Sequence, residues 1–191
     1  MRSTMNKLIA LSLIPLLSGC LSASAPRVTQ WLLEYKGPVR ATRLTKYEVG
    51  RVSQVLVRSP YNEVGIAVLR ADGSMAFDPY NEYAANPTAM LKGFVFDAMD
   101  ASGIFGTVVN PSSSVKSQAL VEVVIARLAL DCRREGERKA VASVRVRLIS
   151  DDGKALHVQG EGTVDAKDGN YGAALSNALS MALNSAFGQL R

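Results

Sequence analysis

The sequence predicts an α+β domain in which a mostly antiparallel sheet is covered by two main helices, at about residues 87–102 and 171–190. Several segments are rich in β-branched and aromatic residues, and two others repeat apolar residues every three or four positions. In the second half, two neighbouring segments alternate apolar and polar residues around a turn. The 191-residue chain is long enough for one domain with a substantial core, which we place at residues 30–191.

The first half contains several strand candidates. Residues 30–35 and 47–58 have strand-like composition, rich in Val, Leu, Tyr and Trp. Residues 64–69 run into the turn sequence 71–74, after which residues 75–77 resume strand-like composition. We expect these last segments to form a hairpin.

The first helix is expected to begin at Asn86-Pro87. Asparagine accepts a hydrogen bond from a free backbone N–H, and the fixed φ and missing donor of proline suit the first helical position. One apolar face then follows, formed by Met90, Leu91, Phe94, Val95, Ala98 and Met99. Gly103 is a suitable C-terminal stop, after which we expect a short strand at 104–109 and a serine-rich loop from Asn110-Pro111.

Three strands are expected next. Ala119–Cys132 is apolar at nearly every position, which is typical of a mid-sheet strand buried on both faces. Residues 140–149 and 155–164 alternate, so each has one wet face. A three-residue loop, 151–153, aligns their apolar faces, whereas a two-residue loop would mix them. The longer loop puts Gly153 in the left-handed position and pairs Leu148 with Leu156, Arg147 with His157, and Arg145 with Gln159.

The C-terminal helix, 171–190, carries no charged residue. Its apolar stripe consists of Leu175, Leu179, Leu183, Phe187 and Leu190. A second face contains Ala174, Asn177, Ala178, Met181 and Ser185. Exposed helices usually carry charge, so we expect this face to be covered by the sheet, by another copy in a homo-oligomer or by a partner. Small residues in a tight packing arrangement are the alternative.

The N-terminus reads as an export signal. Arg2 and Lys7 flank the start of a chain whose residues 8–17 are apolar, and small residues then lead into a cysteine. About ten apolar residues are too few to span a bilayer, which needs roughly 20. The closing sequence Leu17-Ser18-Gly19-Cys20 resembles the lipobox of bacterial lipoproteins, in which the cysteine thiol receives a diacylglycerol.

This resemblance implies a signal peptide at 1–19, lipidation at Cys20 and a lipidated tether at 20–29. The alternative is a soluble secreted protein cut near Ala23 or Ala25. Leu21 replaces the aspartate that resembles an inner-membrane retention signal, so we expect an anchor at the periplasmic face of the outer membrane.

Composition excludes some classes. The formal net charge of +5 is mild, and two of its cations lie in the signal, which argues against a nucleic-acid partner. One basic cluster, Arg133, Arg134, Arg138 and Lys139, is interrupted by Glu135 and Glu137. It predicts a solvated hairpin tip or, alternatively, a contact with anionic lipid headgroups or an acidic partner. With Cys20 acylated, Cys132 has no disulfide mate and is expected to be a buried thiol.

Catalytic and cofactor motifs are scarce. His157 is the one histidine and is expected on a wet strand face, so we predict no catalytic site and no metal site. The chain has no phosphate-binding loop, dinucleotide fingerprint or nucleophile elbow, and we predict no cofactor. Gly160-Glu161-Gly162 is interpreted as a bulge or a close backbone contact. We therefore expect a protein that is not an enzyme, with a periplasmic hydrolase dependent on His157 as the remaining catalytic option.

A family resemblance covers most of residues 30–190. Pro60-Tyr61, the apolar run 66–69, Tyr83, and the Pro87 that opens an amphipathic helix occur in that order after the lipobox. This order resembles the auxiliary lipoproteins of ABC-type transport systems that work with MCE (mammalian cell entry) proteins, including the paraquat-inducible lipoproteins. Tyr83 stands where that family commonly has tryptophan, and no Asp-Arg pair follows Pro60-Tyr61.

The resemblance implies a non-catalytic docking adaptor for the intermembrane transport of lipid or another hydrophobic molecule. Its partners would be an MCE protein and the permease and ATPase of an ABC transporter. The alternative hypothesis is a periplasmic lipid-binding carrier that shelters an acyl chain between sheet and helix.

Overall fold

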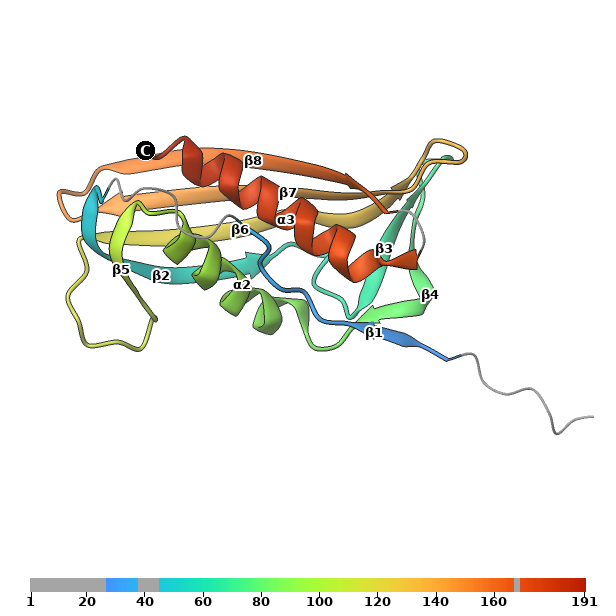
Figure 1. The fold of residues 1–191 in the computed structure, drawn as a ribbon, viewed down its shortest axis with the longest axis horizontal. Helices are drawn as coiled ribbons and strands as arrows, with labels where there is room; N and C mark the ends of the chain where they lie inside the picture. The colour runs from blue at the N-terminus through green and yellow to red at the C-terminus, as the bar shows by residue number, and fades with distance from the viewer. Residues whose placement is uncertain (1–26, 38–44, 167–168) are drawn as a thin grey trace, which may run out of the picture.

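A computed structural model describes residues 27–37, 45–166 and 169–191 (Figure 1). The signal, Cys20 and most of the expected tether lie outside the described residues. Within them, the strands are β1 (Thr29–Trp31), β2 (Tyr47–Val57), β3 (Gly65–Arg70), β4 (Met75–Tyr83), β5 (Phe105–Val109), β6 (Ala119–Cys132), β7 (Lys139–Ser150) and β8 (Ala155–Asp165). The helices are α2 (Pro87–Ala101) and α3 (Tyr171–Gly188).

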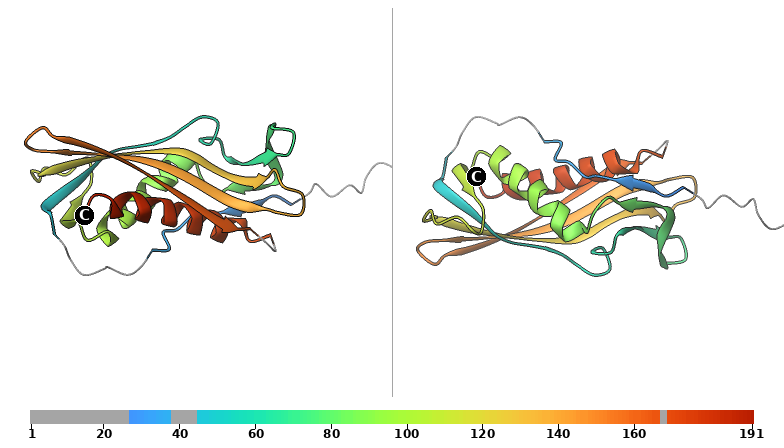
Figure 2. Two further views of the ribbon diagram at one scale, coloured as in Figure 1. Left: turned by 90° about the horizontal axis from the view of Figure 1, so that it is seen from above. Right: turned by 90° about the horizontal axis from the view of Figure 1, so that it is seen from below.

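Both helices lie on the same face of one eight-stranded sheet (Figure 2). The core fills the space between them, with Leu91, Val95, Leu175 and Leu183 fully buried. The opposite face of the sheet carries no helix of the described residues (Figure 2). The α+β class is thus confirmed, and the molecule has two layers.

The sheet is mixed, so the expectation of a mostly antiparallel sheet is wrong. Parallel pairs join β1 to β4, β2 to β5, β2 to β6 and β3 to β6. Antiparallel pairs join β3 to β4, β6 to β7 and β7 to β8. The chain leaves β2 and returns beside it as β5 after passing through α2, and such a crossover makes strands parallel. Strand composition shows where strands occur but not which strands become neighbours.

The expected hairpin of the second half is confirmed in its register. Leu148 pairs with Leu156, Arg147 with His157, and Arg145 with Gln159. The three-residue loop closes with a hydrogen bond of 3.0 Å from the Ser150 amide to the Lys154 carbonyl. Gly153 has a φ of 80°, the left-handed conformation that this loop requires.

The first helix is confirmed, including its cap. The Asn86 side chain accepts hydrogen bonds from the amides of Thr88 and Ala89, at 3.0 and 3.3 Å. Gly103, directly after the end of α2, has a φ of 70°. The helix therefore begins and ends where local sequence signals placed its boundaries.

Two strand expectations need correction. Only 29–31 of the expected first strand pairs with the sheet, because the backbone beyond it bonds to α3 instead. The amides of Glu34 and Lys36 donate to the hydroxyls of Ser176 and Ser180, at 3.2 and 2.9 Å. The strand β6 is buried on one face only, because no described residue covers its other side: Leu120, Glu122, Val124 and Ala126 there are half-buried.

The uncharged helix α3 owes its composition to contacts within the domain. Gly160 and Gly162 let β8 approach the backbone of α3, and residues 34–36 lie along the side that carries Ser176 and Ser180. Ala174 and Ala178 are 5% and 0% exposed, so the expected intersubunit face is largely core. Only Asn177, Met181 and Ser185 of that set are exposed.

Candidate interaction surface

The uncovered face of β6, β7 and β8 gathers side chains from strands that are distant in the sequence. One row across the sheet runs from Leu56 through Val124 and Arg145 to Gln159. The next row contains Glu122, Arg147 and His157. We refer to this face, together with Arg127, as the open face.

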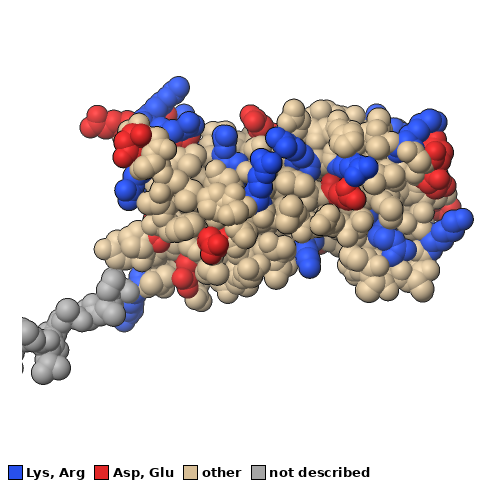
Figure 3. Space-filling view, turned by 180° about the vertical axis from the view of Figure 1, so that it is seen from behind, with Lys and Arg blue, Asp and Glu red and all other residues tan. Residues whose placement is uncertain are grey.

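Cations on the open face exceed their carboxylate partners. Arg147 pairs with Glu122 at 3.3 Å. Among the described residues, neither Arg127 nor Arg145 has a carboxylate oxygen within 4.0 Å. In Figure 3, which views this face, blue side chains predominate across the middle. The centre of the open face therefore carries uncompensated positive charge.

The open face is also hollowed and partly apolar. One hollow of about 460 Å³ lies over Val124, Arg145, Arg147 and His157. A second, of about 510 Å³, includes Arg127 and extends toward the β6–β7 hairpin. Leu56 is 46% exposed beside the first hollow. An exposed sheet face usually alternates to polar residues, so this apolar content marks the face as an interaction candidate.

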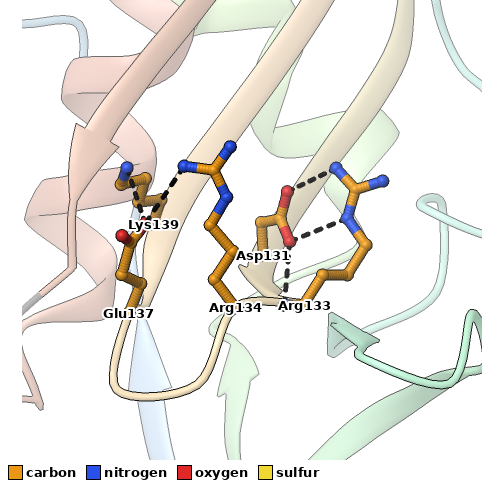
Figure 4. Close-up of polar contacts among 5 residues, drawn as sticks. All are labelled: Asp131, Arg133, Arg134, Glu137 and Lys139. Carbon is orange, nitrogen blue, oxygen red and sulfur yellow. Dashed lines mark hydrogen bonds and ion pairs between the residues drawn. The ribbon is translucent and has the colours of Figure 1, made fainter.

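The basic cluster at the β6–β7 hairpin tip differs from the open face, because its charges are largely paired (Figure 4). Arg133 binds Asp131 at 2.6 Å, and its hydrogen bond lowers the pKa of Asp131. Lys139 binds Glu137 at 2.8 Å and lowers the pKa of that carboxyl group, while Arg134 lies 3.9 Å from Glu137.

Arg138, also at the tip, lies over the ring of Tyr171, 5.1 Å from its centroid. The interpretation as a solvated hairpin tip fits this paired arrangement better than a free cationic patch for lipid headgroups.

The remaining candidate residues are not brought together. His157 is exposed and faces Arg147, as expected. Cys132 is half-buried at the end of β6, more accessible than the buried thiol we expected. Among the described residues, no group of three His, Cys, Asp or Glu side chains could hold a metal ion. Gly160 and Gly162 make the close backbone contact that was one of their two interpretations.

A third hollow lies between sheet and helix. It measures about 600 Å³ and separates part of β2 from α2, with Val52, Val55 and Phe96 supplying apolar surface. Lys92 and Thr88 lie at its border, and the space beside Gly93 is open. We refer to it as the β2–α2 groove. The sequence gave no indication of it, since it depends on how α2 sits against β2.

Solved structures share this fold. A Xanthomonas campestris protein assigned to the DUF330 family superposes with a TM-score of 0.65 and 16% identity, covering 85% of this chain and 92% of its own. An uncharacterized protein gives 0.61 and 15%, with coverage of 87% and 97%. A PelC dodecamer subunit from Paraburkholderia phytofirmans gives 0.43 and 14%, with coverage of 78% and 93%.

At these identities, the similarity establishes an α+β fold shared with the DUF330 protein. No family model matches the sequence. No curated protein matches it either. Neither α2 nor α3, the helices of the described residues, is long and apolar enough to cross a membrane.

Proposed function

We propose that this protein is a lipoprotein of the outer membrane that acts as a non-catalytic docking adaptor for an ABC/MCE-type transport system. The observation that carries the proposal is the apolar run closed by Leu17-Ser18-Gly19-Cys20, which combines export with a lipid attachment point. A folded domain behind such an anchor is restricted to the membrane surface. Its contribution to transport would be to hold the periplasmic end of a partner complex there.

The domain supports this role through its surface. The open face offers positive charge, hollows and exposed apolar side chains on a rigid sheet. Interfaces of this kind combine an apolar centre with charged groups that select a partner. His157 lies in the open with an arginine opposite it, and we propose that it has no catalytic role.

The test is affinity purification of the lipidated full-length protein from membranes of its own host. We expect an MCE protein to co-purify, together with the permease and ATPase of an ABC transporter. Recovery of none of these components, in a preparation where the bait is acylated and folded, would remove the proposal. A His157→Ala variant should support transport as the wild type does, and its failure in a folded protein would reopen the hydrolase option.

The β2–α2 groove favours a second candidate function, that of a lipid carrier. Its volume of about 600 Å³ is within the range of small-ligand sites, and its walls are partly apolar. Stoichiometric phospholipid in mass spectra of the purified domain would support the carrier, and an empty domain that captures an MCE protein supports the adaptor. A Gly93→Phe variant should fill the groove and displace lipid, whereas Gly93→Ser should leave it bound, because the space beside Gly93 is open.

A further inference from the structure

We propose that the open face is the docking surface and that its occupant is an acidic segment of a partner protein. This inference deepens the adaptor role and rests on it. It assigns the contact to Arg127 and Arg145 and to the apolar surface of Leu56 and Val124 beside them. The segment would place apolar side chains against Leu56 and carboxylates beside the two arginines.

Charge complementarity identifies the occupant. Arg127 and Arg145 have no carboxylate partner within 4.0 Å among the described residues, although both belong to the rigid core of the sheet. Arginine is the side chain best suited to bind carboxylates at an interface, because its planar fork can donate two hydrogen bonds. A carboxylate-rich segment supplies the groups that these positions lack.

The register fixes the geometry of the contact. Leu56 lies beside Val124, and Val124 lies beside Arg145, so apolar and cationic side chains occupy one row across three strands. Arg127 lies opposite Ser143, one row further along the same face. A single segment crossing these rows can contact all of these side chains at once.

Two other occupants fit less well. A second copy stacked face to face would bring the same uncompensated arginines together, which costs binding energy. A bilayer surface is flat on the scale of the domain, whereas this face is hollowed at two places. Both alternatives give distinct products in the experiment below.

The test uses the full chain, expressed in its own host, with the photoreactive residue benzoylphenylalanine in place of Leu56. Leu56 is 46% exposed, so the replacement is tolerated by the core. After irradiation, the cross-linked peptide is sequenced by mass spectrometry. We expect one major adduct, with a peptide of another protein that contains more Asp and Glu than Lys and Arg.

Charge reversal provides the second arm. The pair Arg127→Glu and Arg145→Glu should reduce the adduct by at least about tenfold, because like charges then face each other, while the melting temperature stays unchanged. The control Arg134→Glu changes an exposed cation at the hairpin tip and should leave the adduct intact. An adduct that survives the double reversal overturns the inference.

Other products also overturn it. These are an adduct with a second copy of this chain, one with phospholipid, one with a neutral or basic peptide, and the absence of any adduct in the folded protein. Failure of the inference and failure of the adaptor role are distinguishable. If the double variant still purifies with an MCE protein, the adaptor role stands and the docking surface lies elsewhere. If the wild type purifies with no transport component, the adaptor role fails whatever Leu56 contacts.

Discussion

Gly162 of β8 lies so close to Ala178 of α3 that a Cβ atom at Gly162 would stand 1.9 Å from the Ala178 carbonyl oxygen. Gly160 makes the same contact with the carbonyl oxygen of Ala182, also at 1.9 Å. The obstructing atoms are backbone, so a side chain at either glycine cannot be accommodated by a rotamer change. The two glycines therefore set the distance between the helix and the edge of the sheet.

Gly162→Ala should displace α3 and destabilise the domain by about 3 kcal/mol, as overpacking of a tight core does. The melting temperature should fall by about 6–12 °C. The matched control is Gly93→Ala on α2, where the space beside the glycine is open. That change should raise stability by about 0.5–1 kcal/mol, because alanine favours a helix interior. Equal melting temperatures for the two variants would contradict the close approach of β8 and α3.

Ala178→Glu should unfold the isolated domain. Ala178 is fully buried, and an unpaired buried carboxylate costs more than about 4 kcal/mol. The control Met181→Glu lies on the same helix at a residue that is 50% exposed, and it should remain folded. Circular dichroism melting of both variants tests the difference. A folded Ala178→Glu protein would return this position to the surface.

Ser180→Ala should loosen the segment that runs along α3. The Ser180 hydroxyl accepts a hydrogen bond of 2.9 Å from the Lys36 amide, and its removal leaves that donor without a partner. We expect a loss of about 1 kcal/mol and faster amide hydrogen exchange at Lys36. Ser185→Ala, at an exposed position of the same helix, is the control and should leave the exchange rate of Lys36 unchanged.

Much of the fold follows from local patterns. The Asn86 cap, the apolar face of α2 and the turn at Gly153 are each determined by residues close in sequence, and each is confirmed. Strand adjacency is not local. The pairing of β2 with both β5 and β6 depends on how α2 packs, and the 34–36 segment bonds to serines about 140 positions away, at Ser176 and Ser180.

The open face was predictable in part. Alternation and turn length placed Arg145, Arg147 and His157 on one wet face in the correct register. Arg127 was missed, because a bulge between Ile125 and Arg127 shifts the alternation of β6 and turns an odd-numbered residue to the face that carried even-numbered ones. The charged Arg127 within an otherwise apolar stretch, 123–130, was the available sign of that shift.

Tyr83→Phe should stabilise the protein. The Tyr83 hydroxyl is buried, and it has no hydrogen-bond partner among the described residues, so its removal should gain about 1 kcal/mol at neutral pH. Burial raises the pKa of Tyr83 above its usual value of 10.0. Above about pH 10 the unfolded chain releases this proton while the folded protein keeps it, so stability falls as the pH rises.

The advantage of Tyr83→Phe should accordingly grow above pH 10, by about 1.4 kcal/mol per pH unit. Urea unfolding at pH 8 and pH 11 measures this difference. Tyr80→Phe removes a phenol that is 53% exposed and should show neither effect. A constant difference between wild type and Tyr83→Phe across this range would mean that the phenol ionises in the folded state as well.

Cys20→Ala should block acylation and leave uncut precursor, because the thiol is the atom that would carry the diacylglycerol. One acyl chain gives only marginal membrane binding, with an association constant of about 10⁴ M⁻¹ for a myristoyl group, whereas several chains hold a protein almost permanently. Palmitate labelling with membrane fractionation measures both effects. The chain has two cysteines, so Cys132→Ala is the matched control and should keep label and membrane retention. Label that persists in Cys20→Ala and disappears in Cys132→Ala would move the anchor into the folded domain and remove the basis for the adaptor.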